Sequence, residues 1–154
     1  MKFINTKDPQ VLAALNRPVQ DLHHQKYPQF FKPYDEEVCV AFFQRQLEKP
    51  NWVVFLVEIE GQNAGYASYF VKDYQENPFR KAYRSIYVDQ VCVLDQFKGK
   101  GVGKHVMQKI EKDAKEIGIS HIELSYWELN KEAKGFYEHL GYHTYSRIVG
   151  KHLS

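Results

Sequence analysis

The stretch that decides the fold of this chain runs from Val91 to Lys104 and reads VCVLDQFKGKGVGK. Its apolar, β-branched start is typical of a strand, whereas Val106, Met107 and Ile110 just beyond it repeat at helical spacing. Three glycines alternate with other residues between these patterns, so the backbone can turn sharply there. The stretch therefore predicts a strand, a glycine-rich turn and a helix in direct succession.

The glycine-rich turn has the composition of a phosphate-binding loop. Glycines let the backbone approach a ligand closely, and free N–H groups at a helix start favour a phosphate. Lys98, Lys100 and Lys104 add positive charge. The turn predicts a ligand that carries phosphate, and the alternative interpretation is a glycine-rich turn within a solvated lysine patch.

Two common phosphate-binding motifs do not fit this turn. A Walker loop would need glycine where Lys98 stands and Ser or Thr where His105 stands. A dinucleotide fingerprint would need its third glycine at Lys104. Glu123 lies at a distance suited to a ribose-binding acid, but it falls early in its strand and no strand–helix–strand unit precedes the loop. ATP, nicotinamide and flavin cofactors are therefore disfavoured.

The remaining sequence predicts an α+β fold with a mixed, mostly antiparallel sheet. Three consecutive strands indicate an antiparallel meander, and a later strand–helix–strand unit indicates a parallel pair. Pro18 should kink or divide the first helix. The expected helices lie at about 9–22, 35–48, 106–117 and 131–140, and the expected strands at about 52–59, 64–73, 82–94, 122–126 and 142–149.

A second motif, NKEAKGFYEHLGY, spans Asn130–Tyr142. Together and in this order, the two motifs resemble those of the GNAT N-acetyltransferase superfamily. Lys98 departs from the family pattern, which has Gln or Arg there; lysine keeps the charge but not a planar, multi-donor head. The resemblance implies one N-acetyltransferase domain over 1–154, with N-terminal helices in about 9–49, an acetyl-CoA-binding core in about 85–142 and a splayed parallel strand pair flanked by helices.

The resemblance also implies which residues bind acetyl-CoA as cosubstrate, without a metal. In the family, backbone groups of the splayed strand pair with pantetheine, amides of the glycine-rich turn hold the pyrophosphate, and the residue matching Asn130 binds the pantetheine side. Read from sequence alone, Asn130 would be an ordinary helix cap. The implied cofactor-binding residues are Val91, Cys92, Val93, Lys98, Gly99, Lys100, Gly101, Val102, Gly103, Lys104, Asn130, Ala133 and Tyr137.

The expected reaction is direct attack of a primary amine on the thioester through a tetrahedral intermediate. An alkyl amine has a pKa near ~10.4, so a base or a water chain must remove its proton at neutral pH. A backbone N–H at a strand bulge could stabilise the oxyanion. In the family, the tyrosine that matches Tyr137 protonates the departing thiolate. Without the resemblance, Tyr137 would be interpreted as a core residue of its helix.

Two carboxylates are candidates for the general base. Asp89 precedes the cofactor strand by two residues, and the alternation of side chains along a strand places it on the same face as Val91 and Val93. Glu123 lies on the following strand, on the face opposite its apolar neighbours. The alternative for each is a solvated or ion-paired carboxylate at a strand edge. The histidines of this region are better interpreted as surface residues.

The amine acceptor is expected to be a small molecule or a peptide, bound by parts of the chain that match no motif. Packing of the N-terminal helices on the sheet is the alternative role for these residues, and a module that binds acetyl-CoA without transferring acetyl is the alternative function. The candidate acceptor residues are Tyr27, Phe30, Phe31, Tyr34, Tyr69, Asp73 and Tyr74.

Composition and charge disfavour a nucleic-acid-binding protein and a membrane-spanning protein. With 154 residues, 44% apolar and 26% charged, the chain is typical of one globular domain. A net charge of +2 is too small to indicate nucleic acid, and no apolar run is long enough for a membrane span. Two distant cysteines without CxxC spacing predict a reduced, cytoplasmic setting. A homodimer is expected if the strand at 142–149 forms an exposed edge.

Overall fold

The structure is a computed structural model that describes residues 1–154. A 3₁₀ turn at Asp95–Phe97 joins the fourth strand to the third helix. In chain order the elements are β1 (Lys2–Asn5), α1 (Pro9–Lys26), α2 (Glu36–Leu47), β2 (Trp52–Ile59), β3 (Gln62–Tyr74), β4 (Tyr83–Val93), α3 (Val102–Glu116), β5 (Ile122–Leu124) and α4 (Lys131–His139).

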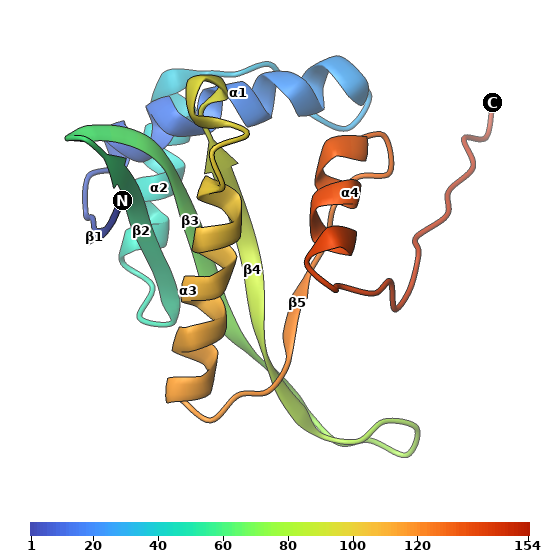
Figure 1. Ribbon diagram of the computed structural model, residues 1–154. Coiled ribbons are helices and arrows are strands. Elements are labelled where there is room, and N and C mark those ends of the chain that lie inside the picture. The colour runs from blue at the N-terminus through green and yellow to red at the C-terminus, as the bar shows by residue number, and fades with distance from the viewer.

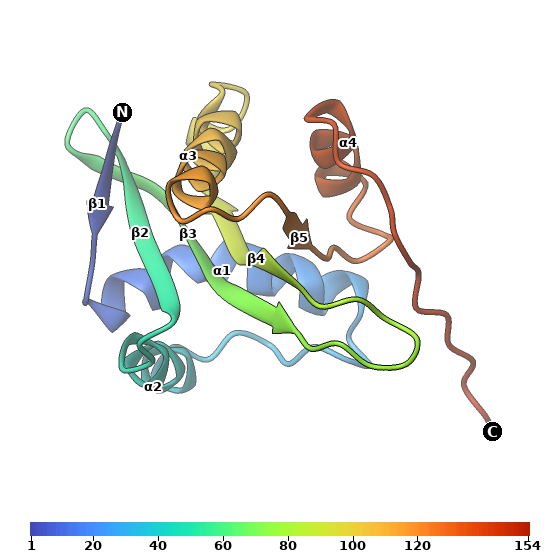
Figure 2. The ribbon, with the colours of Figure 1, turned by 90° about the horizontal axis from the view of Figure 1, so that it is seen from below.

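The five strands form one mixed sheet in the order β1-β2-β3-β4-β5. The first four are antiparallel to their neighbours, and β5 runs parallel to β4. Figure 2 shows α1 and α2 on one face of the sheet and α3 and α4 on the other. The predicted α+β class, with an antiparallel meander followed by a parallel pair, is confirmed.

Each face of the sheet carries its own apolar core, because side chains alternate along the strands. On one face, Val106, Met107 and Ile110 of α3 are fully buried in a cluster with the inward residues of β2, β3 and β4. On the other face, Leu12 of α1 and Phe43 of α2 are buried in a second cluster. The sheet is therefore the shared wall of two cores.

The N-terminal helices begin at side-chain caps. Asp8 accepts hydrogen bonds from the amides of residues 10 and 11 at 3.0 and 3.2 Å, and Asp35 accepts one from Val38 at 3.1 Å. Of the two outcomes predicted for Pro18, a kink or a division of the first helix, the division is wrong, because α1 continues through Pro18 to Lys26. Packing on the sheet outweighs the one helical hydrogen bond that proline removes.

No helix combines the length and apolar character needed to cross a membrane.

Two strand predictions are corrected at the ends of the chain. The sequence analysis missed β1. Its four residues, KFIN, are all exposed, and apolar and polar residues do not alternate along them. The predicted strand at 142–149 is wrong: the segment forms neither helix nor strand, and Ile148 and Val149 are 103% and 90% exposed. Its residues favour a strand, but no neighbouring strand of the same chain pairs with it.

A β-bulge interrupts the ladder between β3 and β4. Ser68 pairs with Gln90 and Tyr69 pairs with Val88, so Asp89 is an extra residue in β4. Beyond the bulge, β3 passes so close to β4 that a Cβ on Gly65 would lie 2.0 Å from the carbonyl oxygen of Cys92. Only glycine permits this approach.

Replacing Gly65 by alanine should therefore destabilise the protein by about 2–3 kcal/mol, because the added methyl meets backbone that cannot move without breaking the ladder. The matched control is Gly135→Ala in α4, where an added Cβ meets nothing within 4 Å. It should stabilise the helix by about 1 kcal/mol. Urea unfolding measures both, and wild-type stability of Gly65→Ala would show that the ladder shifts freely.

Candidate active site

The site is built around the place where β4 and β5 part. The two strands pair only from Ile86 to Val88 and from Ile122 to Leu124. β4 continues to Val93, still paired with β3 on its other side, whereas β5 ends. Figure 1 shows the two strands diverging toward α1, with α3 and α4 on either side of the opening. One backbone edge of β4 therefore faces an opening and not a strand.

The bulge turns the side chain of Asp89 away from the predicted position. Asp89 was expected on the same face as Val91 and Val93, but the extra residue interrupts the alternation. Its carboxylate accepts hydrogen bonds from Trp52 Nε1 at 3.2 Å and from Ser68 Oγ at 3.5 Å, on the α1/α2 face of the sheet. Asp89 therefore lies beside the opening with its carboxylate held by two donors.

The backbone amides of the glycine-rich loop have no hydrogen-bond acceptors within the protein. Gly99 and Gly101 have φ of +74° and +77°, a left-handed conformation that favours glycine. α3 has no side-chain cap, and its first backbone hydrogen bond runs from His105 N to Gly101 O at 3.1 Å. None of the amides from residue 99 to residue 104 donates a hydrogen bond within the protein. They lie at the positive end of the helix dipole, so the loop suits a pyrophosphate.

The three lysines of the loop do not act alike. Lys98 Nζ lies 3.0 Å from Asp95 Oδ1 and 3.6 Å from Glu132 Oε1, and these carboxylates raise its pKa. Lys98 therefore connects the loop to the first turn of α4. Lys100 and Lys104 are exposed and form no ion pair, so their charges remain available to an anion.

Gly103 has a packing role that the sequence analysis missed. A Cβ at this position would lie 2.9 Å from Cζ of Phe136 in α4. The first turn of α3 and the middle of α4 therefore touch, and this contact holds the glycine-rich loop beside the helix that carries the second motif. The amide of Gly103 still belongs to the row of free donors.

Asn130 begins α4 and retains binding capacity. Its Oδ1 accepts a hydrogen bond from Ala133 N at 3.2 Å, so Asn130 is the helix cap. Its Nδ2 donates to no protein group and stays available to a ligand. The cap interpretation and the pantetheine-ligand prediction are therefore compatible, because they use different atoms of one carboxamide.

Tyr137 is fixed by its neighbours, but its hydroxyl has no hydrogen-bond partner in the protein. Its ring lies 6.2 Å from that of Tyr126, nearly parallel, and 5.7 Å from that of Tyr142. Burial raises the pKa of Tyr137, and the neighbouring Tyr142 and Cys92 raise it further. Its hydroxyl is therefore held in the protonated form near β4.

Glu123 lies on the α1/α2 face of β5, next to Tyr87 of β4. The Tyr74 hydroxyl donates to its Oε2 at 2.6 Å, and its Oε1 is buried without a hydrogen-bond partner. Burial raises the pKa of Tyr74, and the hydrogen bond to Glu123 adds to this shift. Both candidate bases therefore occupy the same face of the sheet, and each is already engaged by protein donors.

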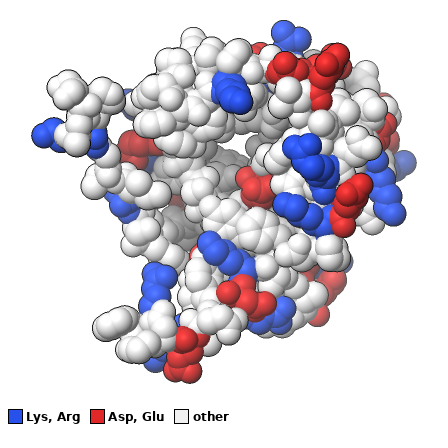
Figure 3. Space-filling model, turned by 180° about the vertical axis from the view of Figure 1, so that it is seen from behind, with Lys and Arg blue, Asp and Glu red and all other residues white.

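The predicted acceptor groove is only partly assembled. Tyr27, Phe30 and Phe31 gather around Trp127, which the sequence analysis missed, with ring centroids 4.7–5.7 Å from it. Trp127 lies just before Asn130, and its place beside the second motif was the available signal. Figure 3, viewed from the α1/α2 side, shows this face hollowed near its centre.

The other predicted groove residues are used elsewhere. Tyr34 donates to Ala13 O at 2.9 Å, and Tyr69 donates to Asp113 at 3.0 Å on the α3 face. Asp73 pairs with the guanidinium of Arg84 at 3.0 Å. These side chains make contacts within the fold at separate places and do not line one groove.

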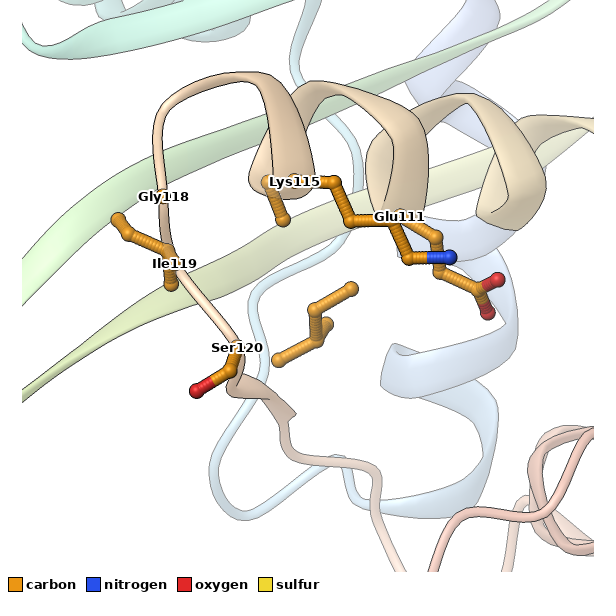
Figure 4. Close-up of a pocket in the computed structure, with 7 residues that line it drawn as sticks. Glu111, Lys115, Gly118, Ile119 and Ser120 are labelled. Carbon is orange, nitrogen blue, oxygen red and sulfur yellow. The ribbon is translucent and has the colours of Figure 1, made fainter.

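A separate pocket lies at the far end of α3 (Figure 4). Glu111 and Lys115 line it from the helix, and Gly118, Ile119 and Ser120 from the following loop. The glycine-rich loop is at the opposite end of α3, so this pocket is no part of the amide row.

Comparison with known proteins places this geometry in a family. The family model described as Acetyltransferase (GNAT) family matches residues 17–142. An uncharacterised N-acetyltransferase of Lactobacillus delbrueckii subsp. lactis is 25% identical over 104 residues, covering 68% of this chain and 59% of the relative. A thialysine N-epsilon-acetyltransferase of Bos taurus is 29% identical over 69 residues, covering 45% and 41%. The chain thus spans less than two thirds of the length of these relatives.

Solved structures share the fold. A mutant of the BH1408 protein from Bacillus halodurans superposes with a TM-score of 0.93 at 20% identity over 100% of both chains. A "predicted acetyltransferase with acetyl-CoA" from Clostridium acetobutylicum has a TM-score of 0.68 at 17% identity, covering 98% of this chain and 94% of that one.

The two cysteines should differ in reactivity, which tests the packing of β4 at the opening. Burial raises the pKa of Cys92 to about 12, so at about pH 8 only about one thiol in ten thousand is ionised. Cys39 is partly exposed. A thiol reagent should therefore label Cys39 first, and Cys39→Ser should abolish the fast phase while Cys92→Ser leaves it. A fast reaction of Cys92 in the folded protein would contradict this packing.

Proposed function

Because this chain belongs to the acetyltransferase (GNAT) family, we propose that it transfers the acetyl group of acetyl-CoA to a primary amine. The observation that carries the proposal is the row of free amides at residues 99–104, beside the opening between β4 and β5. A phosphate-bearing ligand with an extended arm matches both features. Near the same opening, the hydroxyl of Tyr137 has no hydrogen-bond partner in the protein. It can supply the proton that the departing thiolate needs.

The parts of the site divide the ligand between them. The amides of residues 99–104 hold the pyrophosphate, and Lys100 and Lys104 add charge at its edge. The free backbone edge of β4 at Val91–Val93 pairs with the amides of the pantetheine arm. Asn130 Nδ2 donates to the same arm from α4. Acetyl-CoA supplies the thioester that the amine attacks.

Tyr137 is the proposed general acid. Two flanking tyrosine rings fix its orientation, and its hydroxyl is committed to no protein acceptor. Its raised pKa keeps it protonated through neutral and mildly alkaline pH, and the protonated form is the one that can donate to a thiolate. Raising the pH over that range therefore favours deprotonation of the amine without removing the acid.

The acceptor amine is proposed to arrive on the α1/α2 face. Asp89 and Glu123 both lie there, and the hollow of Figure 3 opens on the same side. Either carboxylate can take the amine proton, directly or through water. The thialysine acetyltransferases among the relatives acetylate a lysine analogue, which supports a small amine as the acceptor.

Cofactor choice is tested by titration calorimetry with CoA, ATP and NADH, in which CoA should bind most tightly. Gly101→Asp should abolish CoA binding, because a carboxylate is placed among the amides that hold the pyrophosphate. Gly118→Asp is the matched control: Gly118 is also left-handed, at φ +73°, but lies at the other end of α3. It should keep CoA binding despite a similar backbone strain. Tighter binding of ATP or NADH would overturn the assignment.

Tyr137→Phe should lower kcat by roughly 10²–10⁴-fold while CoA affinity and stability change little, because only the donated proton is lost. The assay follows free thiol released from acetyl-CoA with a panel of amines. Tyr126→Phe, the parallel ring beside it, is the control and should keep its activity. Near-normal kcat in Tyr137→Phe would show that thiolate leaves without this acid. CoA binding without turnover of any amine would instead indicate a binding module.

A further inference from the structure

The chain keeps the alternation of β5 after that strand ends. Glu123 lies on the α1/α2 face, and two residues later the Ser125 hydroxyl lies 2.9 Å from the hydroxyl of Tyr87, which points to the same face. Two residues further on, Trp127 packs against aromatic rings at the end of α1. A carboxylate, a hydroxyl and an indole therefore follow one another along one face, with roughly 6–7 Å of backbone between successive members.

Four aromatic rings gather where this row of side chains meets α1, and none of them belongs to either apolar core of the sheet: Tyr27, Phe30, Phe31 and Trp127. Two of these rings are open to solvent. Phe30 is 68% exposed and Trp127 is 39% exposed, and their centroids lie 5.7 Å apart with the ring planes inclined by 32°. We call Phe30 and Trp127 the aromatic platform. Neighbouring apolar rings left open to water are typical of a surface that binds a ligand.

Hydrogen bonds fix the two segments that carry the platform. The amides of Phe30 and Phe31 donate to Tyr27 O at 3.0 Å each, so the chain turns tightly after α1. The Leu129 amide donates to the Tyr27 hydroxyl at 2.8 Å and thereby joins this turn to the segment before α4. Figure 1 shows the end of α1 beside the loop that leads into α4. A surface that is already ordered loses little conformational entropy when a ligand binds to it.

The charges around the platform favour an uncharged ligand group. Glu128, which follows Trp127 in the chain, lies 3.5 Å from Lys134 Nζ and is thereby paired. The ring of His23 stacks on that of Phe31 with centroids 4.7 Å apart, and burial lowers the pKa of His23. This imidazole is therefore neutral at neutral pH. An uncharged aromatic ring is the group that such a surface suits best, because it can stack on one ring and meet the other edge-on.

We propose that the acceptor is a primary amine that carries an aromatic ring on a short alkyl chain, with the ring on the aromatic platform and the amine directed to Glu123. This inference rests on the acetyl transfer proposed above and names its acceptor class. The alkyl chain would pass Ser125, and the amine would approach a carboxylate whose Oε1 is buried without a hydrogen-bond partner. An amine without a ring would leave the platform in water.

The reaction itself is unchanged by this assignment. The N–C bond to the acetyl group forms as the C–S bond breaks, the amine proton passes to a carboxylate or to water, and the thiolate takes the proton of Tyr137. The platform touches neither the thioester nor the departing thiol. Its contribution is therefore expected in the KM of the acceptor and not in kcat.

The test compares phenethylamine with propylamine in the assay of thiol released from acetyl-CoA. The wild-type protein should show a kcat/KM roughly tenfold or more higher for phenethylamine, because its ring is buried on the platform. Phe30→Ala and Trp127→Ala should each lower this preference by roughly tenfold, and Trp127→Phe should keep part of it. The matched control is Phe79→Ala: Phe79 is 95% exposed in the β3–β4 hairpin, far from the platform in sequence, and its replacement should keep the preference.

Three outcomes would overturn the assignment. The first is an equal kcat/KM of the wild-type protein for the two amines. The second is a higher kcat/KM for a linear diamine of matched length, which would show that the platform recognises a cation. The third is an equal loss of activity toward both amines in Phe30→Ala and in Trp127→Ala, which would show that these rings only support the fold.

Fluorescence separates this inference from the acetyl transfer on which it rests. Trp127 is 39% exposed whereas Trp52 is 8% exposed, so phenethylamine should change the emission of Trp127 in a saturable way and propylamine should not. Trp127→Phe should lose the change. A saturable change without thiol release from any amine would refute the acetyl transfer, and with it the acceptor role of the bound amine. Thiol release with propylamine but no saturable change with phenethylamine would refute the platform and leave the transfer intact.

Discussion

The parting of β4 from β5 after three paired residues is the constraint on which the rest of this structure depends. A parallel pair normally continues as a ladder, but here β4 goes on alone and exposes one backbone edge. The bulge at Asp89 and the close approach of Gly65 to β4 keep the other edge joined to β3. The sheet therefore opens at one place while both of its apolar cores remain intact.

Helix packing turns this opening into a site. The contact between Gly103 and Phe136 sets α3 against α4, and the ion pair of Lys98 with Glu132 connects the glycine-rich loop to the first turn of α4. The same geometry leaves six successive amides without protein partners, and an anion could accept hydrogen bonds from them. A side-chain cap at this helix start would have stabilised the helix but would have occupied an amide that the proposed pyrophosphate uses.

The proposed acid and the two candidate bases lie on opposite faces of the sheet. Burial raises the pKa of Tyr137 on α4 and so keeps it protonated, whereas Asp89 and Glu123 lie on the opposite face and accept hydrogen bonds from protein donors. In the proposed reaction, the amine and the departing thiol would therefore meet their proton acceptor and donor from opposite faces.

The sequence by itself determined the features that depend on local chemistry. These include the glycine-rich turn before α3, the cap at Asn130, the position of Tyr137 two turns later, and the α+β order of elements. Tertiary structure alone decided features that depend on a distant neighbour: the bulge that turns Asp89, the Gly103–Phe136 contact and the aromatic cluster around Trp127. The predicted strand at 142–149 failed for the same physical reason. Strand-favouring residues form a strand only where another strand offers its backbone, and periodicity within one segment carries no information about that partner.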